Sequence, residues 1–214
     1  IRNSSPNDFV RCITNPLDVI VMALQKYSGL PKNKVVGMAG ILDSSRFIYF
    51  LSQELKVPVN NIESFVLGGH GDSMVAMLES TKVNGKKIHE LVNEKKITKE
   101  KLDQIVERTK KGGAEIVKYL EKGSAFYAPA ASGVQMAECY LKDLKRQLPC
   151  AVYLNEKYGV KDIYAGVPVI IGAGGVEKII EINLSAEEKI NFEKSIKAVK
   201  DLFDAAKKID PNLK

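Results

Sequence analysis

The spacing of apolar residues repeats one strand and one helix twice over the first quarter of the chain. A short apolar run at residues 9–13 predicts a strand, and the helix predicted over 15–28 ends at Gly29, a typical helix stop. A second apolar run at 34–38 leads into helical spacing over 42–56. This alternation predicts an α/β arrangement with a parallel sheet and crossover helices.

Beyond residues 57–61 the pattern changes to short strands joined by turns. Further strands are predicted at residues 65–67, 74–83, 151–154, 167–171 and 177–182. The turn dipeptide Asn84-Gly85 predicts an antiparallel ribbon after the second of these. The run 172–175 resembles half of a phosphate-binding loop, but a strand follows it rather than a helix. We therefore interpret 172–175 as a hairpin turn.

Three further helices are predicted in this second part. Thr98 caps the first, which Gly112-Gly113 should interrupt by a kink or by close packing. The second covers residues 128–147, and the third opens with a capping box of Ser185 and Glu188. The chain thus has a parallel first part and a mixed second part.

Composition narrows the class of protein. The 214 residues are 45% hydrophobic and 27% charged, which is typical of a globular protein with a sizeable core. The longest apolar run, residues 19–24, is far shorter than the ~20 residues of a membrane helix. Three cysteines without a CxxC motif favour a reducing compartment, so the expected location is cytoplasmic. Two histidines and no ligand pair at metal spacing predict no metal site.

The positive charge is concentrated in one segment. Residues 82–122 hold twelve basic and seven acidic residues, out of a net charge of +6 for the whole chain. A phosphate-binding stripe is one interpretation. However, acidic residues are interleaved with the basic ones and no nucleic-acid motif accompanies them, so a solvated helix face is favoured and no nucleic-acid partner is expected.

Two segments carry side chains suited to acid–base chemistry. His70 stands between glycines at the end of a predicted strand, as a candidate general base or as a turn residue bonded to backbone. Asp43 and Arg46 share one face of a predicted helix start, either as a local ion pair or as separate functional groups. In the second case Asp43 would orient a histidine and Arg46 would hold a carboxylate. His70, Asp72 and Ser73 are adjacent in one turn and make no hydrolase triad.

Asn15 also has two interpretations. It could cap the first helix, with Pro16 in the first turn, and spacing alone favours this. It could instead contact a ligand, because the carboxyl ends of parallel strands face the crevice where ligands bind.

Three segments together resemble the lactate and malate dehydrogenase family. They are Ile13-Thr14-Asn15-Pro16, Leu42-Asp43-Ser44-Ser45-Arg46-Phe47 and Gly69-His70-Gly71-Asp72-Ser73. The resemblance implies that Asp43 and His70 transfer the proton, Arg46 and Asn15 bind the substrate, and Ile13, Thr14 and Asn15 line the site of the cofactor NAD. It also implies a small-molecule substrate and a homo-oligomer, either a dimer or a tetramer.

Three short segments of this sequence resemble the malate type of that family more than the lactate type. These are Met38-Ala39-Gly40 before the second segment, Gly69 before His70, and Phe126-Tyr127-Ala128-Pro129 at a helix start. The resemblance implies reversible oxidation of malate to oxaloacetate, with lactate or another 2-hydroxy acid as the alternative substrate. A truncated non-catalytic subunit or a basic binding module is a second alternative.

The family's dinucleotide fingerprint GxGxxG does not occur in this sequence, and the first residue is Ile1 rather than Met. We therefore expect a fragment in which residues 1–57 hold the last two strands of a Rossmann parallel sheet. Residues 58–214 would form an α+β catalytic domain with antiparallel strands and long helices. By itself, such a chain is expected to be poorly soluble and inactive as a dehydrogenase.

Overall fold

A computed structural model describes residues 1 and 3–213 of the chain. Its strands are β1 (Val10–Cys12), β2 (Val35–Gly37), β3 (Ile62–Glu63), β4 (Val66–Leu67), β5 (Val75–Ala76), β6 (Lys82–Val83), β7 (Lys86–Lys87), β8 (Arg146–Asn155), β9 (Lys161–Gly172) and β10 (Gly175–Ile179). Its α-helices are α1 (Leu17–Ser28), α2 (Gly40–Leu55), α3 (Ile88–Asn93), α4 (Lys99–Lys110), α5 (Gly112–Leu120), α6 (Tyr127–Leu141) and α7 (Ala186–Ile209). Among the helices of this described part, none is both long and apolar enough to cross a membrane.

The main sheet has the strand order β1-β2-β8-β9-β10. β1 and β2 are parallel, as predicted, and Met38 N donates to Cys12 O at 2.8 Å where they end. Their carboxyl ends therefore lie together, which brings the segments after residues 12 and 37 to one edge. β2 meets β8 antiparallel at Gly37 and Ala151, where a Cβ on Gly37 would lie 2.9 Å from the Ala151 Cβ.

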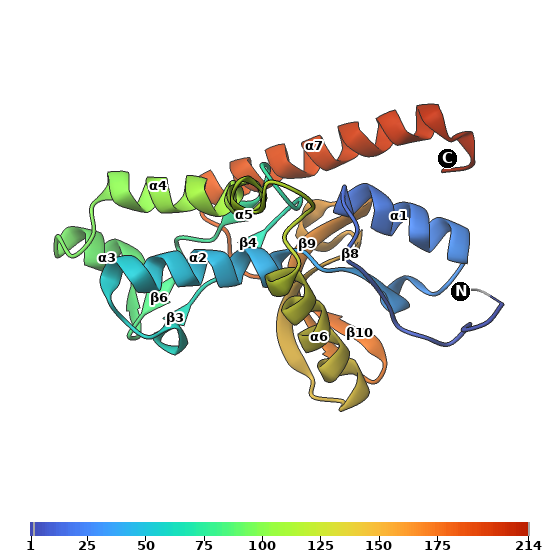
Figure 1. Cartoon of the computed structure of the whole chain (residues 1–214), viewed down its shortest axis with the longest axis horizontal. Coiled ribbons are helices and arrows are strands. Elements are labelled where there is room, and N and C mark those ends of the chain that lie inside the picture. Colours follow the sequence, from blue (N-terminus) through green and yellow to red (C-terminus); the bar gives the residue numbers. More distant parts are fainter. Residues whose placement is uncertain (2, 214) are drawn as a thin grey trace.

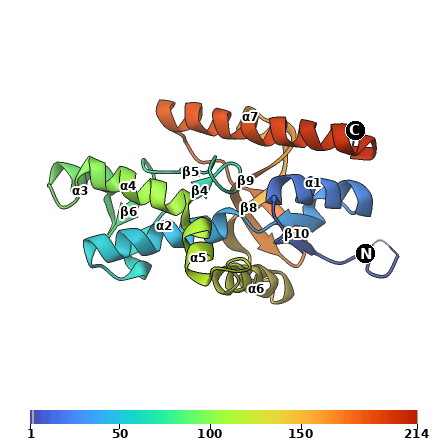
Figure 2. The same cartoon turned by 45° about the horizontal axis from the view of Figure 1, so that its top comes forward.

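Helices cover both faces of this sheet (Figure 1). α1 and α7 lie side by side on one face, and α6 packs against β9 and β1 on the other. Figure 2 shows the same arrangement from a second direction, with α3 and α4 away from the sheet and α2 extending toward them from β8. The largest apolar core lies around the sheet, and a second one lies between α2, α4 and the short strands.

The predicted helix ends and most turns are confirmed. Gly29 ends α1 with a left-handed backbone, and Ser185 and Glu188 form the capping box of α7. Thr98 caps α4 through its side chain. Asn84 and Gly85 both have positive φ in the β6–β7 turn, and the run 172–175 joins β9 to β10 as a hairpin.

Two predictions are wrong. The strand over 74–83 is two short strands separated by a turn, because Thr81 Oγ1 bonds Met77 O at 2.7 Å and competes with extended backbone. The helix over 128–147 ends at Leu141, and 146–147 already belong to β8. Pairing with β9 decides this, since Arg146 lies opposite Ile171 and extends a long antiparallel ladder. Both β8 and β9 are longer than the apolar runs that predicted them.

Candidate active site

Residues 13–15, which follow β1, line a cavity, and none of them caps helix α1 among the described residues. Pro16 is the N-cap residue of α1, its backbone is extended, and no side chain caps this end. The capping interpretation of Asn15 is therefore wrong, because α1 begins one residue later than Asn15 would need. Ile13, Thr14 and Asn15 line the cavity instead.

Helix α2 presents Asp43 and Arg46 from its first turns. Asp43 is 1% exposed, and its Oδ1 lies 3.8 Å from Nη1 of Arg46, which is within ion-pair range but too far for a hydrogen bond. Nε of Arg46 is buried and has no hydrogen-bond partner among the described residues. Burial lowers the pKa of Arg46, although Asp43 partly opposes this. Arg46 thus keeps donors free for a ligand.

The predicted interruption at Gly112-Gly113 is a break between α4 and α5, and it lies against Arg46. A Cβ on Gly112 would be 3.0 Å from Cδ of Arg46, whereas the nearest contact of one on Gly113, among described residues outside the adjacent backbone, would be Nη1 of Arg46 at 4.0 Å. The absence of a side chain at Gly112 therefore makes room for the guanidinium arm.

His70 lies in a glycine turn held by three helices. Gly68 and Gly71 adopt positive φ values of 87° and 102°, which favour glycine. The backbone N–H of Gly69 donates to Oγ of Ser195 on α7 at 2.8 Å, and the N–H of His70 donates to Oδ2 of Asp18 on α1 at 2.8 Å. The third helix, α2, supplies Asp43, whose Oδ2 lies 2.8 Å from Nδ1 of His70.

The protonation of His70 is set by its surroundings. Burial lowers its pKa, but the hydrogen bond and charge of Asp43 together with the charge of Asp18 outweigh burial and the repulsion of Arg46, so the pKa is raised. Because a carboxylate can only accept, Nδ1 carries a proton toward Asp43. In the neutral ring Nε2 is then unprotonated and can accept a proton, as a general base must.

The predicted site residues meet at one cavity of about 850 Å³. Ile13, Thr14, Asn15, Arg46 and His70 all line it, and Asp43 lies behind His70. Further lining residues come from α4, α5, α6 and α7 and include Lys110, Lys111, Val117, Phe126, Pro129 and Leu202. The cavity thus combines a candidate base, His70, with the cations Arg46, Lys110 and Lys111 and with apolar walls, an arrangement suited to a small anionic substrate.

Sequence reasoning missed four residues of this site. Asp18 looked like any acidic residue in a first helical turn, and Ser195 lies 126 positions from the glycine it holds. Lys110 and Lys111 belong to the basic segment but line the cavity. Only the helix start at Asp18 offered a local signal, and the same signal fits interaction with the helix dipole.

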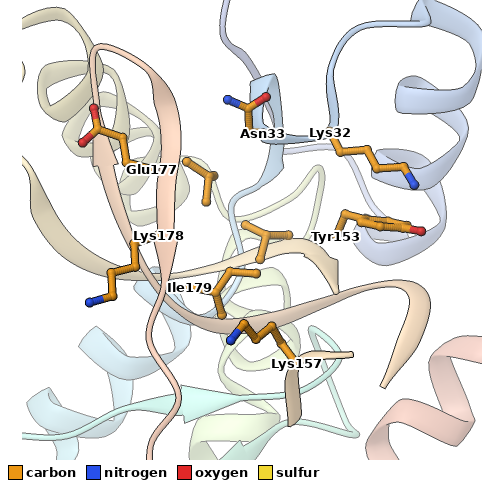
Figure 3. Close-up of a pocket in the computed structure, with 9 residues that line it drawn as sticks. Lys32, Asn33, Tyr153, Lys157, Glu177, Lys178 and Ile179 are labelled. Carbon is orange, nitrogen blue, oxygen red and sulfur yellow. The ribbon is translucent and has the colours of Figure 1, made fainter. Parts of the chain in front are cut away.

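A smaller cavity of about 310 Å³ lies between β8, β10 and residues 32–33. Figure 3 shows the amines of Lys32 and Lys178 on opposite sides of it. Lys32 Nζ lies 3.4 Å from the Tyr153 ring centroid, and Lys157 pairs with Glu181 at 2.7 Å. These cationic groups do not converge on one ligand position.

No cluster of three or more His, Cys, Asp or Glu side chains in residues 1 and 3–213 is arranged to hold a metal ion. The three cysteines, Cys12, Cys139 and Cys150, are buried and free.

Known proteins resemble this chain over nearly all of its length. It is 68% identical over 213 residues to a malate dehydrogenase of Pelagibacter ubique (strain HTCC1062) and spans 67% of that relative. A crystal structure of Cryptosporidium parvum malate dehydrogenase superposes with a TM-score of 0.94 at 45% identity, covering 97% of this chain and 66% of that one.

Lactate dehydrogenases superpose equally well. The Eimeria maxima enzyme, solved with NADH and oxamate, gives a TM-score of 0.95 at 43% identity, covering 99% of this chain and 64% of its own. The Cryptosporidium parvum enzyme, solved with lactic acid and nicotinamide adenine dinucleotide, gives 0.94 at 46% identity, covering 95% and 64%. This chain thus spans about two thirds of the relatives it matches.

The family described as lactate/malate dehydrogenase, alpha/beta C-terminal domain, matches residues 41–209. That range contains Asp43, Arg46, His70 and nearly all of α2 and α7, whereas α1 with Asp18 lies before it. With most of the chain matched in this way, and with the identities above, the chain belongs to the lactate/malate dehydrogenase family.

Proposed function

We propose that the protein catalyses the reversible NAD-dependent oxidation of malate to oxaloacetate. The observation that carries this proposal is the contact of His70 Nδ1 with Asp43 Oδ2 at 2.8 Å beside Arg46 in one cavity. The malate dehydrogenase name of the Pelagibacter relative supports the choice of substrate.

The proposed reaction assigns one task to each side chain. Arg46 binds the carboxylate of the 2-hydroxy acid through its planar guanidinium. Asn15 bonds the hydroxyl oxygen, and Nε2 of His70 takes the hydroxyl proton as the C2–H bond breaks. Asp43 stabilises the resulting imidazolium, and reduction runs through the same steps in reverse.

The residues that would hold NAD at this cavity are Ile13, Thr14 and Asn15. NAD, when bound, accepts the hydride from C2. The fit is supported by the cavity, which is large enough for a nicotinamide ring beside a four-carbon diacid, and by Ile13, which leaves an apolar side chain 41% exposed at its wall. Positioning by Arg46 and Asn15 would bring C2 to reactive distance of that ring.

The test is a steady-state assay of the complete gene product with NADH and either oxaloacetate or pyruvate. Higher kcat/KM with oxaloacetate is expected, and preference for pyruvate would replace malate by lactate. His70→Asn should lower kcat by about 100-fold or more, whereas His89→Asn, an exposed histidine outside the cavity, should not. Arg46→Lys should raise KM by about 10-fold or more, because the bidentate contact is lost. Normal kinetics of both site variants would remove these assignments.

Further properties of the protein are proposed from family membership and from sequence. We propose that residues 1–57 complete an NAD-binding Rossmann domain and that 58–214 form the substrate domain, although β8 joins the sheet of the first part. A homo-oligomer, dimer or tetramer, and a cytoplasmic location are also proposed, the latter from the free cysteines. Basic residues of the segment 82–122 pair with acidic neighbours, as in Arg108–Glu115 at 2.6 Å, which favours a solvated face over a basic binding module.

A further inference from the structure

A second carboxylate, Asp18, reaches the histidine turn from a different helix than Asp43. Asp18 stands in the first turn of α1, three residues after Asn15, and lines the same cavity. Its Oδ2 accepts the backbone N–H of His70 at 2.8 Å. A Cβ on Gly69 would lie 3.4 Å from the same oxygen, so the turn passes close to this carboxylate.

The second oxygen of Asp18, Oδ1, has no hydrogen-bond partner in residues 1 and 3–213. Asp18 is 6% exposed, and Oδ1 is buried without a partner among the described residues. A buried carboxylate oxygen left unpaired is costly, and structural needs alone would be met by an amide or a hydroxyl. An acidic group in this place is therefore explained better by its charge than by its single hydrogen bond.

That charge acts on a small set of neighbours. The ionisable groups facing Asp18 and His70 are Asp43 and Arg46 on α2 and the thiol of Cys12 on β1. Asp43 and Asp18 both favour the protonated imidazole, and Arg46 disfavours it. The ring of His70 is thus subject to the charges of carboxylates on two separate helices, of which Asp43 contacts the ring and Asp18 contacts the main chain.

We propose that Asp18 is a positioning residue for proton transfer, fixing the main chain of His70 and adding a second negative charge that holds a proton on its ring. The inference rests on the proposed function, since it concerns the same histidine. It also connects the segment 13–15, which would contact substrate and cofactor, with the proton-transfer pair through the start of α1.

The direct test is a pH titration of the histidine ring signals by NMR in the complete protein labelled with ¹³C-histidine. His70→Asn and His89→Asn identify the two signals by their loss. Asp18→Asn keeps an oxygen that can accept the His70 N–H and removes the charge. It should lower the pKa of His70 by about 0.5 to 1 unit, a 3- to 10-fold loss of proton affinity. The exposed His89, which lies near Glu79, is the internal control and should not shift.

A second readout comes from wild-type protein alone. The amide ¹⁵N signal of His70 should follow the titration of the Asp18 carboxyl carbon, because the two groups share a hydrogen bond. An unshifted His70 pKa in folded Asp18→Asn overturns the proposal. If that variant does not fold, an amide signal of His70 that ignores the Asp18 titration overturns it instead.

Kinetics separate this inference from the proposed function. In malate oxidation His70 must be unprotonated, so the acid limb of the kcat/KM profile should move to lower pH in Asp18→Asn by the same 3- to 10-fold in proton concentration. If Asp18 had only a structural role, Asp18→Asn would lower activity without moving the acid limb of the kcat/KM profile. Absence of any dehydrogenase activity in wild-type protein would refute the proposed function and leave the NMR result on Asp18 to stand by itself.

Discussion

Replacement of Asp18 by asparagine is expected to stabilise the protein at neutral pH while weakening its proton transfer. Burial raises the pKa of Asp18 from 3.8 to about 6, although the His70 amide and ring charge oppose this. A carboxyl group whose pKa is higher in the folded state binds protons more tightly there than in the unfolded chain. The contribution of Asp18 to stability therefore falls as pH rises from the unfolded pKa of 3.8 to the folded pKa of about 6.

The size of the effect follows from the difference in pKa. From 3.8 to about 6 is about 2.2 units. At about 1.4 kcal/mol per unit this is about 3 kcal/mol, the most that ionising Asp18 can cost the folded protein. Asparagine removes that cost, so the stability gap between the variant and wild type should open from pH 4 to pH 6. It should widen further where His70 loses its proton, because wild type also loses the stabilising attraction between Asp18 and the His70 cation there. His70 acts in a separate window, because its raised pKa gives stability that is present below 6.5 and is lost as pH rises through the folded value.

Urea denaturation at pH 4, 5, 6 and 7 measures this gap directly. Asp103→Asn, a change of an exposed aspartate on α4, is the matched control and should leave the pH dependence unchanged. A free-energy difference between wild type and Asp18→Asn that is the same at pH 4 and pH 7 would refute the reasoning. It would mean that Asp18 is not desolvated in the folded protein.

Two other variants test the supports of the site. Gly112→Ala should raise KM for the carboxylate substrate about 5-fold, because its Cβ would meet Arg46 Cδ at 3.0 Å and move the guanidinium. Gly113→Ala, whose Cβ would lie 4.0 Å from Nη1 of Arg46, is the control, and equal KM values for the two variants would contradict the packing argument. Ser195→Ala leaves the buried N–H of Gly69 without its acceptor and should lower the free energy of unfolding by about 1–2 kcal/mol in urea, and an unchanged midpoint would show that the bond contributes nothing.

Local signals in the sequence predicted much of the fold. Gly29 and Ser185 act within one helix turn, so their roles as helix stop and cap could be read without tertiary contacts. The end of α6 at Leu141 could not, because residues 146–147 pair with β9, a strand more than twenty positions away, and the chain must leave the helix before them. Strand lengths were underestimated for the same reason.

The candidate site also contains residues that local sequence predicted and residues that only the folded structure reveals. Asp43, Arg46 and His70 stand in short segments with distinctive neighbours, and the structure brings these residues together. For Asn15, spacing alone favours a helix cap, whereas the resemblance to the family implies contact with substrate and cofactor, and the structure shows that Asn15 does not cap α1. Asp18 could not be predicted from its local sequence, because its partner His70 lies 52 positions away.

The hydrogen bond between Ser195 and the glycine turn at Gly69 can form only late in synthesis, after the rest of the turn has been made. Gly69 and Ser195 are 126 residues apart, so the ribosome makes the turn long before it makes α7. A nascent chain ending before residue 195 already contains Asp18 and Asp43, the two groups that bond His70 itself. Because chains fold from the N-terminal end as they emerge, α7 would close onto a histidine already held by two helices. Its docking would then be the last step in building the turn, and proteolytic removal of α7 would expose the Gly69 amide while leaving the contact between Asp43 and His70 in place.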